Sequence, residues 1–324
     1  MNEVRNDRLV TVFGGAGFLG RYVVRQLARR GWRIRVAVRR PDLAGHLQPL
    51  GNVGQIKPIQ ANVRYRDSID AAIHGSDAVV NLVGILAASG RQSFSAVQAY
   101  GAGQIAESAK EHGLDRIVQI SAIGADAGSS SAYARSKAEG EQAVLEALPA
   151  SVVMRPSILF GPEDDFFNRF AQMARLSPVL PLVGPDTRFQ PTFVADVAEA
   201  IARAVEGEAR PGTIYELGGP QVKTFRELMQ LMLEEIDRPK KPIVAIPFGM
   251  ASMQAKVLSL LPKPPLTPDQ VELLKSDNVV SEAARSEGRT FDGLGIVPDT
   301  LAAILPTYLW RFRPSGEFSR QQAG

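Results

Sequence analysis

A tyrosine and a lysine four residues apart give this sequence its clearest potential chemistry. The segment SSSAYARSKAEGE at 129–141 contains Tyr133 and Lys137. On a helix, that spacing places both side chains on one face. A lysine ammonium beside a phenol lowers the phenol pKa from about 10 toward neutrality, which makes the phenol usable as a proton donor or acceptor. Two ordinary helix residues can also have this spacing. Other parts of the sequence are therefore needed to distinguish an acid–base pair from an ordinary pair of helix residues.

A glycine-rich turn near the N-terminus suggests a phosphate-binding site. The segment RLVTVFGGAGFLGRYVVRQLARRG at 8–31 predicts a short apolar strand, a glycine turn and an amphipathic helix. Glycines there allow a tight turn and a close approach of the backbone to a pyrophosphate, and the helix N-terminus offers free N–H groups. A merely structural turn is the alternative. The predicted cofactor-binding residues of this segment are Gly14, Gly17, Phe18, Leu19 and Gly20.

The second predicted strand, WRIRVAVRR at 32–40, ends in two arginines. Arg39 lies 19 residues after Gly20, close to where NAD-binding proteins carry an acidic residue for the ribose 2′-hydroxyl. A guanidinium pairs well with a phosphate instead. We therefore predict NADP(H) in preference to NAD(H), with Arg39 as the main contact and Arg40 beside it. A solvated arginine at a strand end is the alternative.

Apolar strands and helical stretches alternate through the front half of the chain. Strands are predicted at 55–59, 77–84, 116–124 and 151–156, and helices at 67–74, 94–112 and 131–148. The alternation predicts an α/β fold with a Rossmann doubly wound parallel sheet, which binds ligands beyond the carboxyl ends of its strands. The residues at those ends are Gly14, Arg39, Asn62, Val83, Gly84 and Ser121.

The back half is less regular and predicts a smaller, mixed C-terminal region. We expect residues 1–156, completed by 193–220, to form the dinucleotide-binding Rossmann domain. Residues 157–192 and 221–324 would form the substrate-side or partner-docking region.

Composition excludes several classes of function. The chain has no cysteine, which excludes disulfides and thiolate chemistry. Its histidines, His46, His74 and His112, show no metal-ligand spacing, so no metal is predicted. Residues 1–40 contain ten arginines and two acids, but no aromatic–basic interleaving supports nucleic-acid binding. No signal peptide, transit peptide or membrane span of about 20 apolar residues is expected.

Several motifs carry a family resemblance. In chain order, over residues 8–220, they are GGAGFLG, NLVG, Tyr133-x-x-x-Lys137, MRPSILFGPED, FVADVAEAIARAV and YELGG. With them the sequence resembles the extended short-chain dehydrogenase/reductase superfamily. The resemblance implies that Tyr133 is a general acid/base, that Lys137 holds the nicotinamide ribose, and that Asn62 accepts from the adenine amino group. It also puts Ser121, Pro156, Ser157 and Ile158 in the cofactor-binding set.

A narrower resemblance covers nearly the whole chain. LGNVGQ at 50–55, RPSILFGPEDDFFNRFA and the ending GIVPDTLAAILPTYLWRFR resemble an atypical subfamily of these proteins. That subfamily contains the accessory subunit of respiratory complex I and its bacterial relatives. It implies a protein that holds NADPH without turnover beside the quinone-binding region. The expected location is cytoplasmic, peripheral to the bacterial inner membrane, or the matrix side of the mitochondrial membrane for a mature eukaryotic chain.

One departure from the superfamily concerns catalysis. Working members carry a Ser or Thr about two residues beyond the fifth strand, where it polarises the substrate carbonyl. Here Ser121 ends the strand and Ile123 stands at the expected position of that hydroxyl. Ser121 is therefore a doubtful catalytic residue. A Ser at 129–131 could substitute, although serines before a helix are more often N-caps.

The back half also contains an apolar segment that lies outside these motifs. IVAIPFGMASMQAKVLSLLPKPP at 243–265 has a single charge, Lys256, between Ile243 and Pro262. Pro247 and Gly249 break it, which leaves a helix of about 12 residues, too short to span a bilayer. It is either a lid or core helix, or a surface that docks on a membrane or an apolar partner near Lys240, Lys241, Lys256 and Lys263.

Three functional hypotheses follow. The first is an NADP(H)-binding accessory subunit that stabilises a respiratory complex, with complex I subunits and the membrane surface as partners. The second is a free-standing NADPH-dependent reductase or epimerase that uses Tyr133 and Lys137. The third is a cofactor-sensing regulator, which no distinctive sequence feature supports.

Overall fold

The computed structural model describes residues 7–86, 93–259, 261, 264 and 266–314, which form two compact units. Unit 1 comprises Met1–Pro156, Ala195–Leu217 and Ser281–Val297. Unit 2 comprises Ser157–Val194, Gly218–Val280 and Pro298–Gly324. Of the helices in the described ranges, none has both the length and the apolar character required to cross a bilayer.

Unit 1 is built on one parallel sheet of seven strands in the order β11-β6-β5-β4-β1-β2-β3. Its central strands are mostly buried and consist largely of apolar and β-branched residues, as is typical of parallel sheets. The order is that of the doubly wound nucleotide-binding fold and confirms the predicted fold class. The strands are β1 (Leu9–Phe13), β2 (Arg33–Val38), β3 (Ile56–Gln60), β4 (Ala78–Asn81), β5 (Val118–Ile120), β6 (Val152–Pro156) and β11 (Ile214–Leu217).

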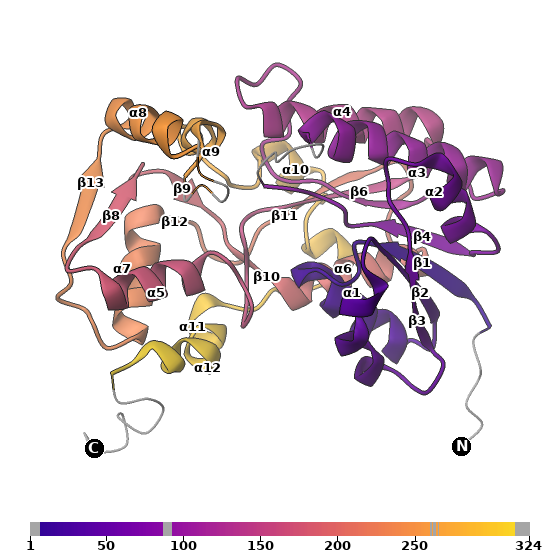
Figure 1. Ribbon diagram of the computed structural model, residues 1–324, viewed down its shortest axis with the longest axis horizontal. Coiled ribbons are helices and arrows are strands. Elements are labelled where there is room, and N and C mark those ends of the chain that lie inside the picture. Colours follow the sequence, from indigo (N-terminus) through magenta and orange to yellow (C-terminus); the bar gives the residue numbers. More distant parts are fainter. Residues whose placement is uncertain (1–6, 87–92, 260, 262–263, 265, 315–324) are drawn as a thin grey trace. The chain divides into compact units, whose positions relative to one another are not determined.

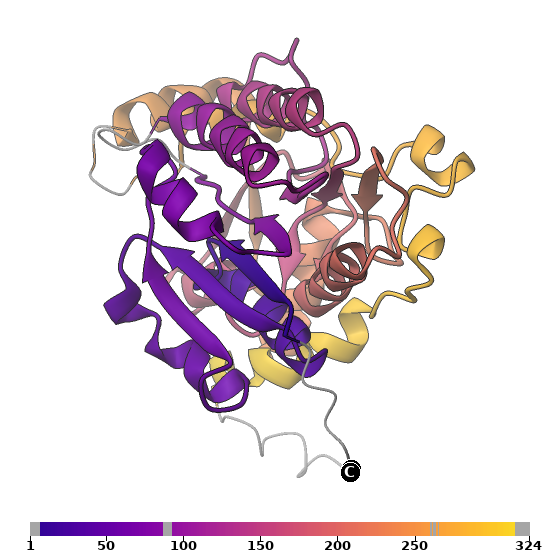
Figure 2. The same ribbon diagram turned by 90° about the vertical axis from the view of Figure 1, so that its right-hand side faces the viewer.

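Helices cover both faces of this sheet. Helices α2, α3 and α4 lie over one face, and α1 and α6 lie over the other (Figure 1). The turned view shows the same layering, with the violet to magenta helices on one side of the strands (Figure 2). The helices of unit 1 are α1 (Phe18–Arg29), α2 (Arg66–Ile73), α3 (Tyr100–Glu111), α4 (Ala132–Ala147), α6 (Val194–Glu206) and α10 (Glu282–Ser286), with shorter turns at Pro41–Leu43, Gly45–Leu50, Ser95–Ala99 and Asp292–Leu294.

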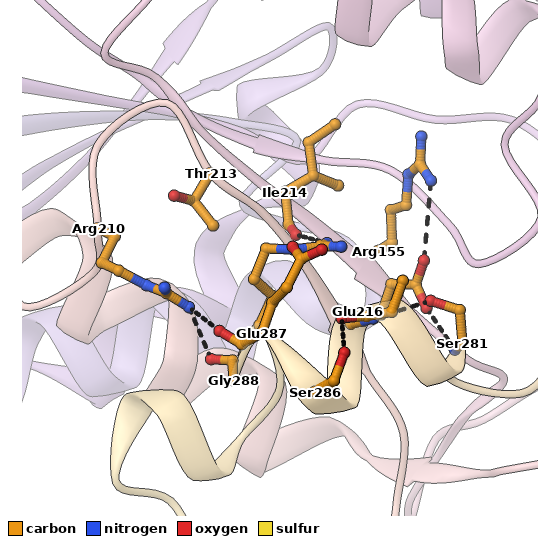
Figure 3. A network of polar contacts seen from close by, with 12 residues as sticks. Arg155, Arg210, Thr213, Ile214, Glu216, Ser281, Ser286, Glu287 and Gly288 are labelled. Carbon is orange, nitrogen blue, oxygen red and sulfur yellow. Dashed lines mark hydrogen bonds and ion pairs between the residues drawn. The ribbon is translucent and has the colours of Figure 1, made fainter.

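A late segment of the chain protects the outer edge of the sheet. Among the described strands β11 pairs with β6 alone, and an open strand edge exposes unpaired peptide groups. On its other side Arg289 Nη1 donates to Ile214 O (2.7 Å), and Glu216 N donates to Arg289 O (2.9 Å). Figure 3 shows the same segment held by Arg210, which donates to the carbonyls of Glu287 and Gly288. From the sequence, all residues after 220 are expected in the second region, whereas the segment Ser281–Val297 belongs to unit 1.

Unit 2 is assembled from small pieces around an apolar core. The pieces include three two-stranded sheets, two of them parallel (β7–β10 and β8–β13) and one antiparallel (β9–β12). The core joins buried side chains of α5 and α7 with Leu301, Leu305 and Leu309 near the end of the chain. The strands and helices are β7 (Leu159–Phe160), β8 (Leu180–Val183), β9 (Arg188–Phe189), β10 (Thr192–Phe193), β12 (Lys223–Thr224), β13 (Ile243–Ile246), α5 (Phe167–Leu176), α7 (Phe225–Glu235), α8 (Phe248–Leu258), α9 (Pro268–Leu273), α11 (Leu301–Ile304), α12 (Pro306–Leu309) and a 3-10 turn, Trp310–Phe312.

A buried carboxylate fastens the C-terminal helices to this core. Asp164 is 2% exposed and accepts hydrogen bonds from Gly161 N (3.0 Å), Asn168 N (3.1 Å) and the hydroxyl of Tyr308 (2.7 Å). Burial raises the pKa of Asp164, and these hydrogen bonds oppose the rise. The residue is therefore a structural anchor of unit 2.

Candidate functional site

The glycine turn forms where the sequence predicts it, between β1 and α1. Gly14 has φ +78°, a left-handed conformation that favours glycine, and Gly17 N donates to Gly14 O (3.1 Å). A Cβ on Gly20 would lie 2.5 Å from Gly14 O, so only glycine lets α1 begin this close to the turn. No described side chain caps α1, and its first turn contains no acidic residue. Its first N–H groups can therefore receive an anion.

The turn lies at the point where the strand order changes direction. β1 has β2 on one side and β4 on the other, and Leu82 N, just after β4, donates to Phe13 O (3.0 Å). A Cβ on Gly14 would lie 3.2 Å from Leu82 C, so the turn also packs against the chain that continues into Val83 and Gly84. Doubly wound sheets bind ligands at such a switch point.

The two arginines after β2 differ in their surroundings. Both are exposed, and Arg40 is held by Asp42 in a two-pronged pair, Nε–Oδ1 3.0 Å and Nη2–Oδ2 2.7 Å. Arg39 makes no hydrogen bond or ion pair with any described residue. After β3, Asn62 is half-buried and its Oδ1 accepts from Arg64 N (3.2 Å). Arg39 is thus the more available of the two cations.

Tyr133 and Lys137 lie on one face of the first turns of α4, with Lys137 Nζ 5.9 Å from the centre of the Tyr133 ring. Ser131 caps the helix by accepting from Ala134 N (3.2 Å), which is the structural role that the sequence analysis weighed for the 129–131 serines. Tyr133 is half-buried, whereas Lys137 is 6% exposed.

The Lys137 ammonium is poorly compensated inside the protein. Its Nζ donates to Ile120 O at 3.4 Å, a long hydrogen bond, and forms no ion pair within the described ranges. Burial lowers the pKa of Lys137 to about 8, against the opposing charge of Glu141. A Cβ on Gly84 would lie 3.3 Å from Nζ, so the ammonium faces the backbone after β4. Hydroxyl oxygens of a bound ligand would supply the missing acceptors.

Ser121 and Ile123 follow the carboxyl end of β5. The Oγ of Ser121 is buried and has no hydrogen-bond partner among the described residues. Such an orphaned hydroxyl is costly unless a ligand or water satisfies it. Ile123 is 9% exposed, and an isoleucine offers no donor for a substrate carbonyl.

Sequence reasoning missed Gln98, which connects two parts of the site. It lies in a π-helical turn, Ser95–Ala99, that precedes α3. Its Nε2 donates to Ile85 O (2.6 Å) and its Oε1 accepts from Ser136 Oγ (2.8 Å), so it ties the chain after β4 to α4 beside Lys137. π-helical turns often mark functional sites, but no sequence periodicity announces one.

Three further predicted residues follow one another in the chain. Pro156 ends β6 and accepts from Ile123 N (3.0 Å) in unit 1. Ser157 and Ile158 belong to unit 2, where Ser157 Oγ donates to Asn278 Oδ1 (2.6 Å) and Ile158 O accepts from Thr192 N (2.9 Å). The other predicted residues belong to unit 1. No group of three or more metal-ligating side chains was found in the described part of the chain.

Known relatives extend over nearly the whole chain. The mitochondrial NADH dehydrogenase [ubiquinone] 1 alpha subcomplex subunit 9 of Arabidopsis thaliana is 37% identical over 95% of this chain and 79% of its own. The mitochondrial NADH-ubiquinone oxidoreductase 40 kDa subunit of Neurospora crassa is 30% identical over 95% and 80%. Ceramide reductase of Caulobacter vibrioides is 33% identical over 59% of this chain and 58% of its own.

Solved structures share the fold at low sequence identity. The NADPH-dependent quinone oxidoreductase QOR2 of Escherichia coli, complexed with NADPH, has a TM-score of 0.70 at 20% identity and covers 93% of this chain and 98% of its own. DesIV of Streptomyces venezuelae, a dTDP-glucose 4,6-dehydratase with NAD bound, has a TM-score of 0.71 at 20% identity over 94% and 96%. Residues 10–218 match the family described as NAD dependent epimerase/dehydratase. With its parallel seven-stranded sheet and glycine turn, the chain belongs to that NAD dependent epimerase/dehydratase family.

Proposed function

We propose that this chain is an accessory subunit of respiratory complex I that holds NADP(H) as a structural ligand near the quinone site. One observation carries the proposal: the similarity to the mitochondrial NADH dehydrogenase subunit of Arabidopsis thaliana runs over 95% of the chain at 37% identity, including the C-terminal unit. Substrate-side regions diverge between enzymes of different function, so similarity there favours a shared role over a shared scaffold alone.

The residues of unit 1 fit a dinucleotide. The uncapped N-terminus of α1 and the Gly14–Gly17 turn suit a pyrophosphate, and Arg39 suits a 2′-phosphate. Ser121 Oγ and Lys137 Nζ are buried polar groups short of partners, as expected for residues that contact a ribose and nicotinamide. When bound, the nicotinamide could supply hydride chemistry, for which Tyr133 would be the proton donor.

Ile123 favours a protein that holds NADP(H) over one that oxidises or reduces it. At this position a reductase needs a hydroxyl to polarise the substrate carbonyl, and the isoleucine offers only hydrocarbon. Lys137 on the ribose would then hold the cofactor, with Tyr133 beside it as scaffold and without a reacting partner. We place the protein on the cytoplasmic face of the bacterial inner membrane, or on the matrix side if the chain is a mature eukaryotic one.

Isolation of the chain from its own membranes tests this function. A tagged chain, extracted in mild detergent, should migrate with complex I subunits on a native gel and carry about one NADPH per chain. Tyr133→Phe should leave both assembly and NADPH content unchanged. Recovery of the chain solely as a species free of complex I subunits would contradict the proposal.

The second candidate is a free-standing reductase. It is favoured by the paired Tyr133 and Lys137 and by the 33% identity to a ceramide reductase over 59% of the chain. Under this hypothesis the purified protein oxidises NADPH with a panel of quinones and carbonyl compounds, and Tyr133→Phe lowers the rate about 100-fold or more, as loss of a general acid does. If the wild-type chain oxidises NADPH with none of these compounds, the reductase hypothesis is contradicted and the accessory role remains.

Arg39 should decide the choice between the two nicotinamide cofactors. We expect Arg39→Ala to weaken NADPH binding about 10- to 100-fold, because a charge-assisted pair with the 2′-phosphate is lost, and to leave NADH binding unchanged. Titration calorimetry with both cofactors measures this. Arg33→Ala, an exposed arginine at the other end of β2, is the matched control. Equal affinity of the wild-type chain for NADPH and NADH would overturn the assignment.

A further inference from the structure

Lys137 and Glu141 are a buried lysine and a buried glutamate one turn apart on α4. The two residues are 6% and 4% exposed. Their spacing puts both side chains on one face of the helix, and charged groups are rarely buried unless they are paired. Although the structure describes both residues, they do not form an ion pair with each other, and the Lys137 ammonium donates instead to Ile120 O at 3.4 Å. The negative charge of Glu141 is therefore balanced by another group.

That group is the guanidinium of Arg155 on β6. Its Nε donates to Glu141 Oε1 (2.8 Å) and its Nη2 donates to Glu141 Oε2 (2.5 Å), so the guanidinium takes both carboxylate oxygens. A two-pronged pair of this kind fixes the orientation of the carboxylate as well as balancing its charge. Because Arg155 holds both oxygens, the Glu141 carboxylate cannot turn toward Lys137.

Arg155 is itself held by the outer edge of the sheet. Its Nη1 lies 3.9 Å from Oε1 of Glu216 on β11, and Glu216 Oε2 accepts from Ser281 N (2.7 Å). Figure 3 shows these contacts, with Arg155 directed toward Glu216 and the start of α10. The segment that covers β11 therefore also helps to place the guanidinium that holds Glu141.

The groups that face the Lys137 ammonium from other elements carry no charge. They are the backbone of Gly84 after β4, the carbonyl of Ile120 on β5 and the amide of Gln98, together with the phenol ring of Tyr133 on α4 itself. Burial lowers the pKa of Lys137 to about 8, and the charge of Glu141 opposes this fall. The remaining charges nearby, those of Glu216 and Asp126, act on Arg155. Glu141 is thus the acid whose balance matters most for Lys137.

We propose that Arg155 is a positioning residue of the cofactor site: by holding Glu141 it cancels that negative charge at Lys137 and leaves the ammonium for the hydroxyls of a bound ribose. A close pair of opposite charges has a much weaker field at a third group than either charge alone. Without Arg155, the buried carboxylate would pair with Lys137, the cation one helical turn away. The role of Arg155 rests on the proposed function for the ligand, whereas its effect on the charge of Lys137 does not.

Titration of Lys137 in the full chain without cofactor tests this role. The NMR chemical shift of Cε in isotope-labelled lysine reports the pKa, and the signal missing from Lys137→Met assigns it. Glu141→Gln should lower the pKa of Lys137 below about 8, because an unbalanced guanidinium then lies nearby. Arg155→Gln should raise that pKa by about one unit or more, because the carboxylate then pairs with the ammonium. The double variant should lie within about 0.5 unit of the wild type, since both charges are gone.

Shifts of opposite sign distinguish this role from a structural one. If the pair only fastened α4 to the sheet, loss of either partner would loosen the site, admit water and raise the pKa of Lys137 in both single variants. Shifts of the same sign, or no shift in either variant, would overturn the proposal. If Arg155→Gln does not fold, the fall in Glu141→Gln and its reversal in the double variant decide the question, because the double variant leaves no buried charge without a partner.

NADPH affinity gives a second readout. Arg155→Gln should bind NADPH about tenfold more weakly for each unit by which the pKa of Lys137 rises, because the ammonium must first leave Glu141. An unchanged affinity despite a raised pKa would contradict the role of Arg155 in the cofactor site. If the wild-type chain binds no NADPH, the proposed function fails, while the pKa values still decide whether Arg155 sets the charge of Lys137.

Arg30→Gln is the matched control. The Arg30 side chain is 24% exposed, against 21% for Arg155, and its Nη2 pairs with Glu199 Oε1 at 2.7 Å in the same unit. This variant also removes one guanidinium from an ion pair, but the pair does not involve α4. It should therefore match the wild type in the pKa of Lys137 and in NADPH affinity.

Discussion

Gly20→Ala is expected to abolish NADP(H) binding and to lower the free energy of unfolding by about 1–3 kcal/mol. Alanine is normally the better helix former, by about 1 kcal/mol, so a gain would be expected from propensity alone. Here the added Cβ would lie 2.5 Å from both Gly14 O and Gly15 C, which are backbone atoms of the turn. These backbone atoms can make room only if the turn moves. Overpacking of this kind lowers the free energy of unfolding by about 1–3 kcal/mol.

Gly17→Ala should separate binding from folding. Gly17 has φ −77°, which alanine adopts freely, and its Cβ would meet Gly14 O at 3.4 Å, an ordinary contact. The fold should therefore change by less than about 0.5 kcal/mol. The methyl group would occupy the space through which a pyrophosphate approaches the backbone. NADPH affinity should fall about tenfold or more while stability stays near that of the wild type.

Urea unfolding without cofactor and NADPH titration measure the two effects on the same proteins. Gly45→Ala is the control, because a Cβ there would meet nothing within 4 Å and the residue has no positive φ. It should match the wild type in both measurements. If Gly17→Ala binds NADPH normally, the phosphates do not lie at this turn. If Gly20→Ala is as stable as the wild type, the close approach of α1 to the turn is not required.

The architecture of unit 1 could be predicted because its signals are local. Runs such as LVTVF and VVMRP read as buried strands, helices separate them, and parallel pairing with right-handed crossovers leaves few possible orders. The covering of β11 could not be predicted in this way. It depends on a side chain, Arg289, that bonds to Ile214 O from 75 positions along the chain, and no periodicity in residues 281–289 encodes that contact.

Unit 2 and part of the site escaped prediction for a related reason. Four of its strands are two residues long, too short for any alternation to show. At the site, residue types and spacing identified the glycine turn and the Tyr133–Lys137 pair. They could not reveal Gln98, because a π-helical turn reads as an ordinary helix in sequence, nor that Ser121 Oγ is left without a partner. Such features arise from how separate elements meet.

Lys137→Met is expected to make the cofactor-free protein more stable at pH 7 and to weaken its hold on NADP(H). The pKa of Lys137 is lowered by burial from 10.5 to about 8, so the folded chain binds this proton less tightly than the unfolded chain. The charged lysine therefore opposes folding at every pH below about 8, by up to about 3 kcal/mol. As the pH rises from about 8 to 10.5 the unfolded state still holds the proton and the folded state releases it, so stability rises through that window.

Methionine matches lysine in shape and removes the charge, so the difference between the two proteins isolates this effect. Urea unfolding without cofactor should show Lys137→Met more stable than the wild type at pH 7, with the gap narrowing at pH 9.5. Lys110→Met, an exposed lysine of α3, should show no gap at either pH. With NADPH added, the order should reverse, because a ligand that satisfies the ammonium stabilises only the wild type. A Lys137→Met protein that is less stable at pH 7 without cofactor would mean that the chain itself, rather than the dinucleotide, satisfies the ammonium.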